Sequence, residues 1–98
     1  MSSKLFEPIK VGNLNLTHRV VLAPLSRLRA NAQHVPNEIT AEYYSQRGSE
    51  PGTLLISEAT VVASKAGGLS HVPGLWNNDQ IAAWKKVWSL TFQNSKTV

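Results

Sequence analysis

A serine hydroxyl and an arginine guanidinium stand directly after a short apolar run near the start of the chain. The run covers residues 20–23 and is rich in β-branched side chains, which is typical of a strand buried on both faces. Pro24 ends the run, because proline has no N–H to give a central sheet ladder, and Ser26 and Arg27 follow. We expect a strand whose carboxyl end delivers polar groups to a site, as in α/β folds. The alternative role for Ser26 is a hydroxyl that caps a helix or loop.

A second apolar run, over residues 53–57, has the same character and also ends in polar side chains. Glu58 follows it directly, either as an acid of the site or as a hydrogen-bonded structural residue, and we favour the structural role. Between the two runs the sequence predicts a helix that begins after Asn37 as N-cap and stops at Gly48. Two parallel strands joined by such a crossover helix form a βαβ unit.

Further elements must support these strands. Residues 9–11 and 14–16 predict a β-hairpin, because the glycine and asparagine between them favour a two-residue turn, and their four apolar side chains then share one face. A second helix is predicted after Asn77, with Gln80 completing a capping box. Its expected apolar stripe is Ile81, Trp84, Trp88 and Phe92. The long loop before it, residues 61–76, has a length that is usually functional.

The composition excludes several classes of protein. The 98 residues carry a net charge of +4, but the lysines and arginines are scattered, so we expect no nucleic-acid partner. Cysteine is absent, no apolar run is long enough to span a membrane, and the N-terminus lacks the apolar segment of a secretory signal. We therefore expect a cytoplasmic protein without a membrane partner. The three histidines lie far apart in the sequence, so we expect no metal site.

Most of the chain resembles, in order, the N-terminal part of the old yellow enzymes, above all their fungal branch. The segments that carry the resemblance are LFEPIKVG (5–12), RVVLAPLSR (19–27), AEYYSQR (41–47), LISEAT (55–60), AGG (66–68), PGLW (73–76) and DQIAAWKKV (79–87). The resemblance implies an α/β fold, the N-terminal fragment of a (β/α)8 TIM barrel: a capping β-hairpin followed by strand, helix, strand and helix. Tyr43 and Tyr44 fall inside the predicted first helix, where we interpret them as packing residues and not as a proton donor.

The resemblance also implies a cofactor and a reaction. Members of the family bind FMN, take hydride from NADPH or NADH, and reduce activated alkenes such as α,β-unsaturated carbonyls, which are small-molecule substrates. Family FMN contacts map onto Pro24, Leu25 and Ser26 after the first strand and onto Ala59 after the second. Ser26 stands where the family usually has threonine and keeps the hydroxyl that bonds a flavin carbonyl. A small residue at Ala59 leaves room for the ring.

The resemblance covers residues 1–87, which we expect to be the N-terminal part of the flavin oxidoreductase barrel. Residues 88–98 form a tail that departs from the family pattern, as a retained intron, a frameshift or a truncated gene model would produce. The family's substrate-binding histidine and asparagine, its tyrosine proton donor and its phosphate-binding arginines map beyond the matched part, so no catalytic residue is assigned. We expect a chain that is inactive alone. The alternatives are an inert fragment, or a binding piece that pairs with a full-length relative or with itself through open sheet edges.

Overall fold

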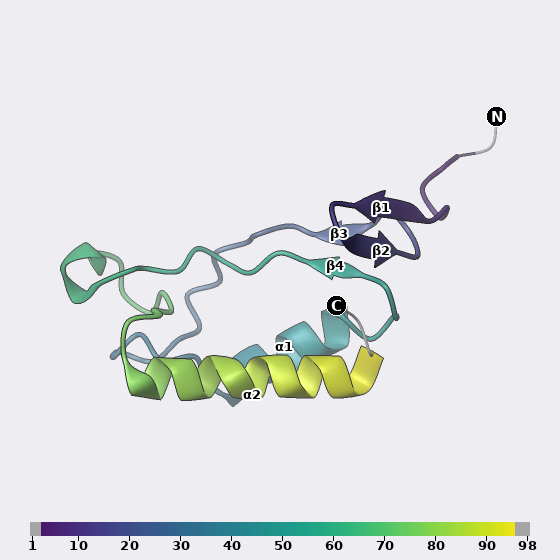
Figure 1. Cartoon of the computed structure of the whole chain (residues 1–98). Coiled ribbons are helices and arrows are strands. Elements are labelled where there is room, and N and C mark those ends of the chain that lie inside the picture. The colour runs from purple at the N-terminus through teal and green to yellow at the C-terminus, as the bar shows by residue number, and fades with distance from the viewer. Residues whose placement is uncertain (1–2, 96–98) are drawn as a thin grey trace.

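The computed structural model describes residues 3–95, and the side chains of residues 3–92. Figure 1 shows a small hairpin at one end, an extended pair of strands, and two helices side by side along one face of that pair. The elements in order are β1 (Ile9–Val11), β2 (Leu14–Leu16), β3 (Val21–Leu22), α1 (Glu38–Arg47), β4 (Leu54–Leu55), the 3₁₀ helix η1 (Ser64–Ala66) and α2 (Asn78–Ser95). In the described part of the chain, no helix is long and apolar enough to cross a membrane.

The predicted hairpin is confirmed, with the expected register. β1 and β2 are antiparallel, with Ile9 opposite Leu16 and Val11 opposite Leu14. Gly12, in the turn, has a φ of +58°, a left-handed conformation that glycine adopts without strain. Figure 1 places the hairpin beside the ends at which β3 and β4 begin, away from the ends at which they stop.

The predicted βαβ unit is also confirmed. β3 and β4 are parallel neighbours, with Val21 opposite Leu54 and Leu22 opposite Leu55, and α1 lies between them in the sequence. Asn37 caps α1 by accepting a hydrogen bond from the N–H of Thr40. Both strands are shorter than the predicted apolar runs. Each of them pairs along one edge only in the described sheet, so little of either run has a ladder partner.

The core lies between the helices and one face of this sheet. It consists of Ala41 and Tyr44 from α1 and Trp84 and Val87 from α2, with Leu22, Leu55 and Tyr43 packed against it. The other face of the sheet is open, because the side chains of Val21 and Ile56 remain 38% and 43% exposed. The radius of gyration, 14.9 Å, exceeds the roughly 13 Å of a compact domain of this length. The chain therefore leaves an apolar sheet face uncovered.

The predicted apolar stripe of α2 is only partly correct. Trp84 is buried, but Ile81, Trp88 and Phe92 are exposed. The side of α2 that is buried instead carries Gln80, Trp84, Val87 and Thr91. The reason is tertiary: α2 buries the side that meets α1 and the loops, and the described sheet ends at β4, so part of the apolar stripe has nothing to cover. The helix continues past residue 87 to Ser95, and residues 96–98 of the predicted tail lie outside the described residues.

Candidate functional site

Two segments leave the same end of the parallel sheet. Leu22 and Leu55 are paired across it, and Ser26 and Ala59 each follow their paired leucine by four residues. Because parallel strands share a direction, both segments extend from the carboxyl-terminal edge, the edge at which α/β folds bind ligands. Figure 1 shows both segments running from the sheet in the same direction, away from the hairpin. The fold thus brings the two predicted contact segments to one edge.

The side chains at this edge suit a flat, largely apolar ligand. The four predicted contact residues are all exposed, so none of them packs in the core: Pro24, Leu25, Ser26 and Ala59. Pro24 and Leu25 offer apolar surface to a ligand, and the small side chain of Ala59 leaves space for one. Within residues 3–95 the Ser26 hydroxyl makes no hydrogen bond to another residue, so it can serve a ligand. An apolar surface with one hydroxyl at its rim is what a fused aromatic ring with a polar edge requires.

Arg27 does not extend from the edge with Ser26. Its guanidinium carbon lies 3.6 Å from the centre of the Tyr43 ring on α1, a cation–π contact. Arg47, at the end of the same helix, lies 4.7 Å from that ring centre. The next residue, Leu28, has a φ of +57°, so the chain turns sharply directly after the arginine. Arg27 therefore fixes the segment to the helix.

Glu58 has the structural role that the sequence favours. It is buried directly before Ala59, and its carboxylate oxygen Oε1 accepts a hydrogen bond of 3.2 Å from the Tyr44 hydroxyl. The N–H of Glu58 donates to the same hydroxyl oxygen at 3.0 Å. Its carbonyl accepts from the hydroxyl of Thr60 at 3.0 Å. The backbone that leads into Ala59 is thus held on both sides. The sequence carries no local signal for this contact, which joins residues 14 positions apart.

This environment changes the acidity of Tyr44. Burial raises the pKa of its phenol from 10.0 to about 12, while the hydrogen bond from the Glu58 N–H opposes the rise and the nearby carboxylate adds to it. The folded state therefore favours the neutral phenol. This shift stabilises the folded chain. The stabilisation is complete when the pH is below 10.0, the pKa of the Tyr44 phenol in the unfolded chain, and it is lost as the pH rises through about 12, the pKa in the folded chain.

We expect a tyrosinate titration, followed by ultraviolet absorbance, to show a late ionisation near pH 12 in the folded chain. The chain has two tyrosines, so each can be removed in turn. Tyr44→Phe should abolish the late step, and Tyr43→Phe should retain it. A late step that persists in Tyr44→Phe would contradict the assignment.

The histidines belong to the loops beyond the strand ends. The ring nitrogen Nδ1 of His34 lies 2.6 Å from the carbonyl oxygen of Val72, and Nδ1 of His71 lies 2.8 Å from that of Ala30. A carbonyl can only accept, so both nitrogens donate. The N–H of Gly74 donates to the carbonyl of His34 at 2.8 Å. These bonds join the loop after β3 to the long loop after β4, and no group of three metal-ligating side chains occurs in the described chain.

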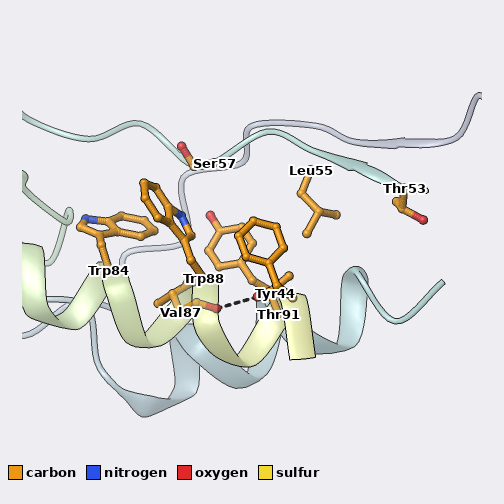
Figure 2. Close-up of a pocket in the computed structure, with 9 residues that line it drawn as sticks. Tyr44, Thr53, Leu55, Ser57, Trp84, Val87, Trp88 and Thr91 are labelled. Carbon is orange, nitrogen blue, oxygen red and sulfur yellow. Dashed lines mark hydrogen bonds between the residues drawn. The ribbon is translucent and has the colours of Figure 1, made fainter. Parts of the chain in front are cut away.

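A mainly apolar cavity of about 140 Å³ lies beneath β4 and the residues that follow it. Figure 2 shows aromatic side chains of the helices, among them Tyr44, Trp84 and Trp88, gathered beneath the segment that carries Leu55 and Ser57. This cavity is a space between helices and sheet. It contains none of the four predicted contact residues.

The chain is similar to known proteins over nearly its whole length. A family model described as the NADH:flavin oxidoreductase / NADH oxidase family matches residues 4–96. An NADP-dependent oxidoreductase of Aspergillus flavus is 55% identical over 87 residues, which are 89% of this chain and 23% of that protein. A chanoclavine-I aldehyde reductase of Penicillium roqueforti is 52% identical over 85 residues, which are 87% of this chain and 23% of the relative.

The fold is similar to that of a solved structure. The crystal structure of an Old Yellow Enzyme from a Pichia species matches with a TM-score of 0.87 and 37% identity, over 93% of this chain and 24% of that one. The likeness confirms the predicted α/β fold, the N-terminal part of a (β/α)8 barrel. This chain spans about a quarter of the length of the relatives that it matches.

Proposed function

The chain belongs to the NADH:flavin oxidoreductase / NADH oxidase family, and from that membership we propose that it supplies the N-terminal quarter of an FMN-dependent NADPH oxidoreductase. In this proposal the strand-end edge forms one wall of the flavin site. Pro24 and Leu25 contact the ring, Ser26 donates a hydrogen bond to its polar rim, and Ala59 leaves room for it. The single observation that carries the proposal is the exposure of these four side chains where two parallel strands end.

The reaction follows the relatives. Bound FMN would supply hydride transfer, from NADPH to an activated alkene such as an α,β-unsaturated carbonyl. The name of one relative, an NADP-dependent oxidoreductase, supports NADPH as the hydride donor, and that of the other, an aldehyde reductase, supports a carbonyl compound as the substrate. The alkene is inferred from the resemblance to the old yellow enzymes. The chain's own part is to bind and orient the ring at one edge. We assign no catalytic role to any residue of this chain.

We propose that the chain alone is inactive. Its described sheet has two parallel strands, and a barrel of this kind needs eight to enclose a site. The remaining walls, including the groups that hold the FMN phosphate, would come from the part of the barrel that this chain does not match. The experiment must therefore supply that part.

A grafted barrel tests the role of Ser26. In it, residues 4–87 of this chain replace the equivalent first quarter of the Pichia Old Yellow Enzyme. Ser26→Ala should lower the reduction potential of the bound flavin by about 20–40 mV, because it removes a hydrogen bond of roughly 1–2 kcal/mol that favours the reduced ring. Ser26→Thr should retain the potential. The matched control is Ser49→Ala, an exposed serine in the loop after α1. An unchanged potential in Ser26→Ala would contradict the assignment.

The open sheet favours a second candidate function. Val20, Val21 and Ile56 are exposed apolar residues next to sheet edges that have no neighbour in the described chain. Such edges pair readily with other strands. The chain would then be a binding piece that pairs with a full-length relative or with itself. A defined oligomer of the flavin-free chain in sedimentation equilibrium would favour this function, and an inert fragment would show none.

A further inference from the structure

Helix α1 presents two adjacent tyrosines to the two segments that leave the sheet. Tyr44 contacts the segment after β4, and Tyr43 contacts the segment after β3. We propose that these tyrosines are positioning residues: together they fix the two flavin-contact segments in place before the cofactor binds. This inference rests on the proposed function for its purpose, but the contacts that carry it are within the chain.

Tyr44 holds the second segment at its backbone. Its hydroxyl donates to the Glu58 carboxylate and accepts from the Glu58 N–H, so one oxygen is bonded to both the side chain and the main chain of that residue. Tyr44 is 5% exposed and Glu58 is 6% exposed, so water does not compete effectively for these bonds. Ala59, the next residue, is exposed. The bonds therefore fix the point from which the segment emerges at the site.

Tyr43 holds the first segment through Arg27. The Arg27 guanidinium stacks on the Tyr43 ring at 3.6 Å, and Arg27 directly follows Ser26. The Arg47 guanidinium also lies against this ring. A cation–π contact at a partly exposed site is worth less than a buried hydrogen bond, so we expect this segment to be held more loosely than the other.

The two tyrosines are coupled by position and by contact. Adjacent helical residues project about 100° apart, which allows one helix to reach two different segments. Their rings meet edge to face with centres 5.3 Å apart, and the Tyr44 ring also lies 6.3 Å from that of Trp84 in the core. Both segments are thus tied to a single packed unit. A site whose walls are held in advance binds its ligand with a smaller entropic cost.

The first test uses the 98-residue chain without flavin. Amide hydrogen exchange by NMR should be about tenfold faster at the Glu58 N–H in Tyr44→Phe, because that N–H loses its partner, while Tyr43→Phe leaves it unchanged. Tyr43→Leu should instead lower the backbone order parameters of residues 24–29, and Tyr43→Phe, which keeps the ring, should preserve them. A urea titration of each variant separates these local changes from a general loss of stability.

The second test uses the grafted barrel. Tyr44→Phe should weaken FMN binding about three- to tenfold and shift the flavin absorption band, and Tyr43→Phe should do neither. If the unmutated graft binds no FMN, the proposed function fails, and the exchange rates in the chain still decide the positioning role. If the graft binds FMN, and Tyr44→Phe changes neither the affinity nor the exchange at Glu58, the inference is overturned while the proposed function stands.

Discussion

Replacing Trp84 with alanine is expected to lower the free energy of unfolding by about 3–5 kcal/mol, which is most of the stability of a small domain. Trp84 is 6% exposed and packs with Ala41, Tyr44 and Val87 between the two helices. Its indole N–H donates to the carbonyl of Gly74 at 3.1 Å, which ties α2 to the end of the long loop. The alanine variant loses both the ring and this bond, and leaves a cavity. Urea unfolding followed by circular dichroism measures the loss.

Trp88 is the matched control for this substitution. It lies one helical turn after Trp84 and is 56% exposed. Trp88→Ala should cost about 0.5 kcal/mol or less, as exposed positions usually do. Trp84→Phe retains most of the ring but not the N–H, so we expect a loss between the two. Equal losses in Trp84→Ala and Trp88→Ala would contradict the described orientation of α2.

The second large effect is expected at Gln80, whose side chain is fully buried at the start of α2. Its Oε1 accepts from the N–H of Trp76 at 2.8 Å and from that of Asn77 at 3.2 Å. Its Nε2 donates to the carbonyl of Gln33 at 3.4 Å. Gln80→Ala leaves these backbone groups without a partner, so we expect a loss of about 2–4 kcal/mol in the free energy of unfolding.

Two further variants test whether the loss in Gln80→Ala comes from its hydrogen bonds or from any substitution of a helical glutamine. Gln80→Glu keeps an accepting oxygen at the helix N-terminus, but at neutral pH it buries a charge and faces the Gln33 carbonyl with a second acceptor. We therefore expect a smaller loss at acidic pH, where the carboxyl is neutral and can still donate, than at neutral pH. Gln46→Ala removes an exposed glutamine from α1 and should cost less than about 0.5 kcal/mol. Faster amide exchange at Trp76 and Asn77 in Gln80→Ala would show that the lost stability comes from these two backbone N–H groups. A loss in Gln80→Ala no larger than in Gln46→Ala would rule out the capping role.

Local features of this fold could be predicted from the sequence. The turn at Gly12, the cap at Asn37 and the capping box of Asn77 and Gln80 depend on residues within a few positions of one another, and all occur as predicted. The parallel pairing of β3 with β4 also followed from two apolar runs and a helix between them. The turn and the two caps depend on a short stretch of chain, and the pairing follows from the order of strand, helix and strand.

The remaining features depend on contacts that the sequence pattern does not specify. The buried side of α2 is set by α1 and the loops, so the apolar spacing alone could not specify which residues of the stripe are buried; Trp84 is, and Trp88 is not. The bonds of Tyr44 to Glu58 and the stacking of Arg27 on Tyr43 join segments that only the folded chain brings together. The flavin contacts at Pro24, Leu25, Ser26 and Ala59 came from resemblance and stay a prediction, as do the boundary at residue 87 and self-association.

The flavin content of the 98-residue chain and of the grafted barrel, purified in parallel, tests the central claim most directly. The claim is that the strand ends of this chain form one wall of a flavin site that the chain alone does not complete. We expect the grafted barrel to carry FMN, visible by its absorption band, and the chain alone to carry none. A chain that purifies with stoichiometric FMN would contradict the claim, as would a grafted barrel that folds and binds no flavin.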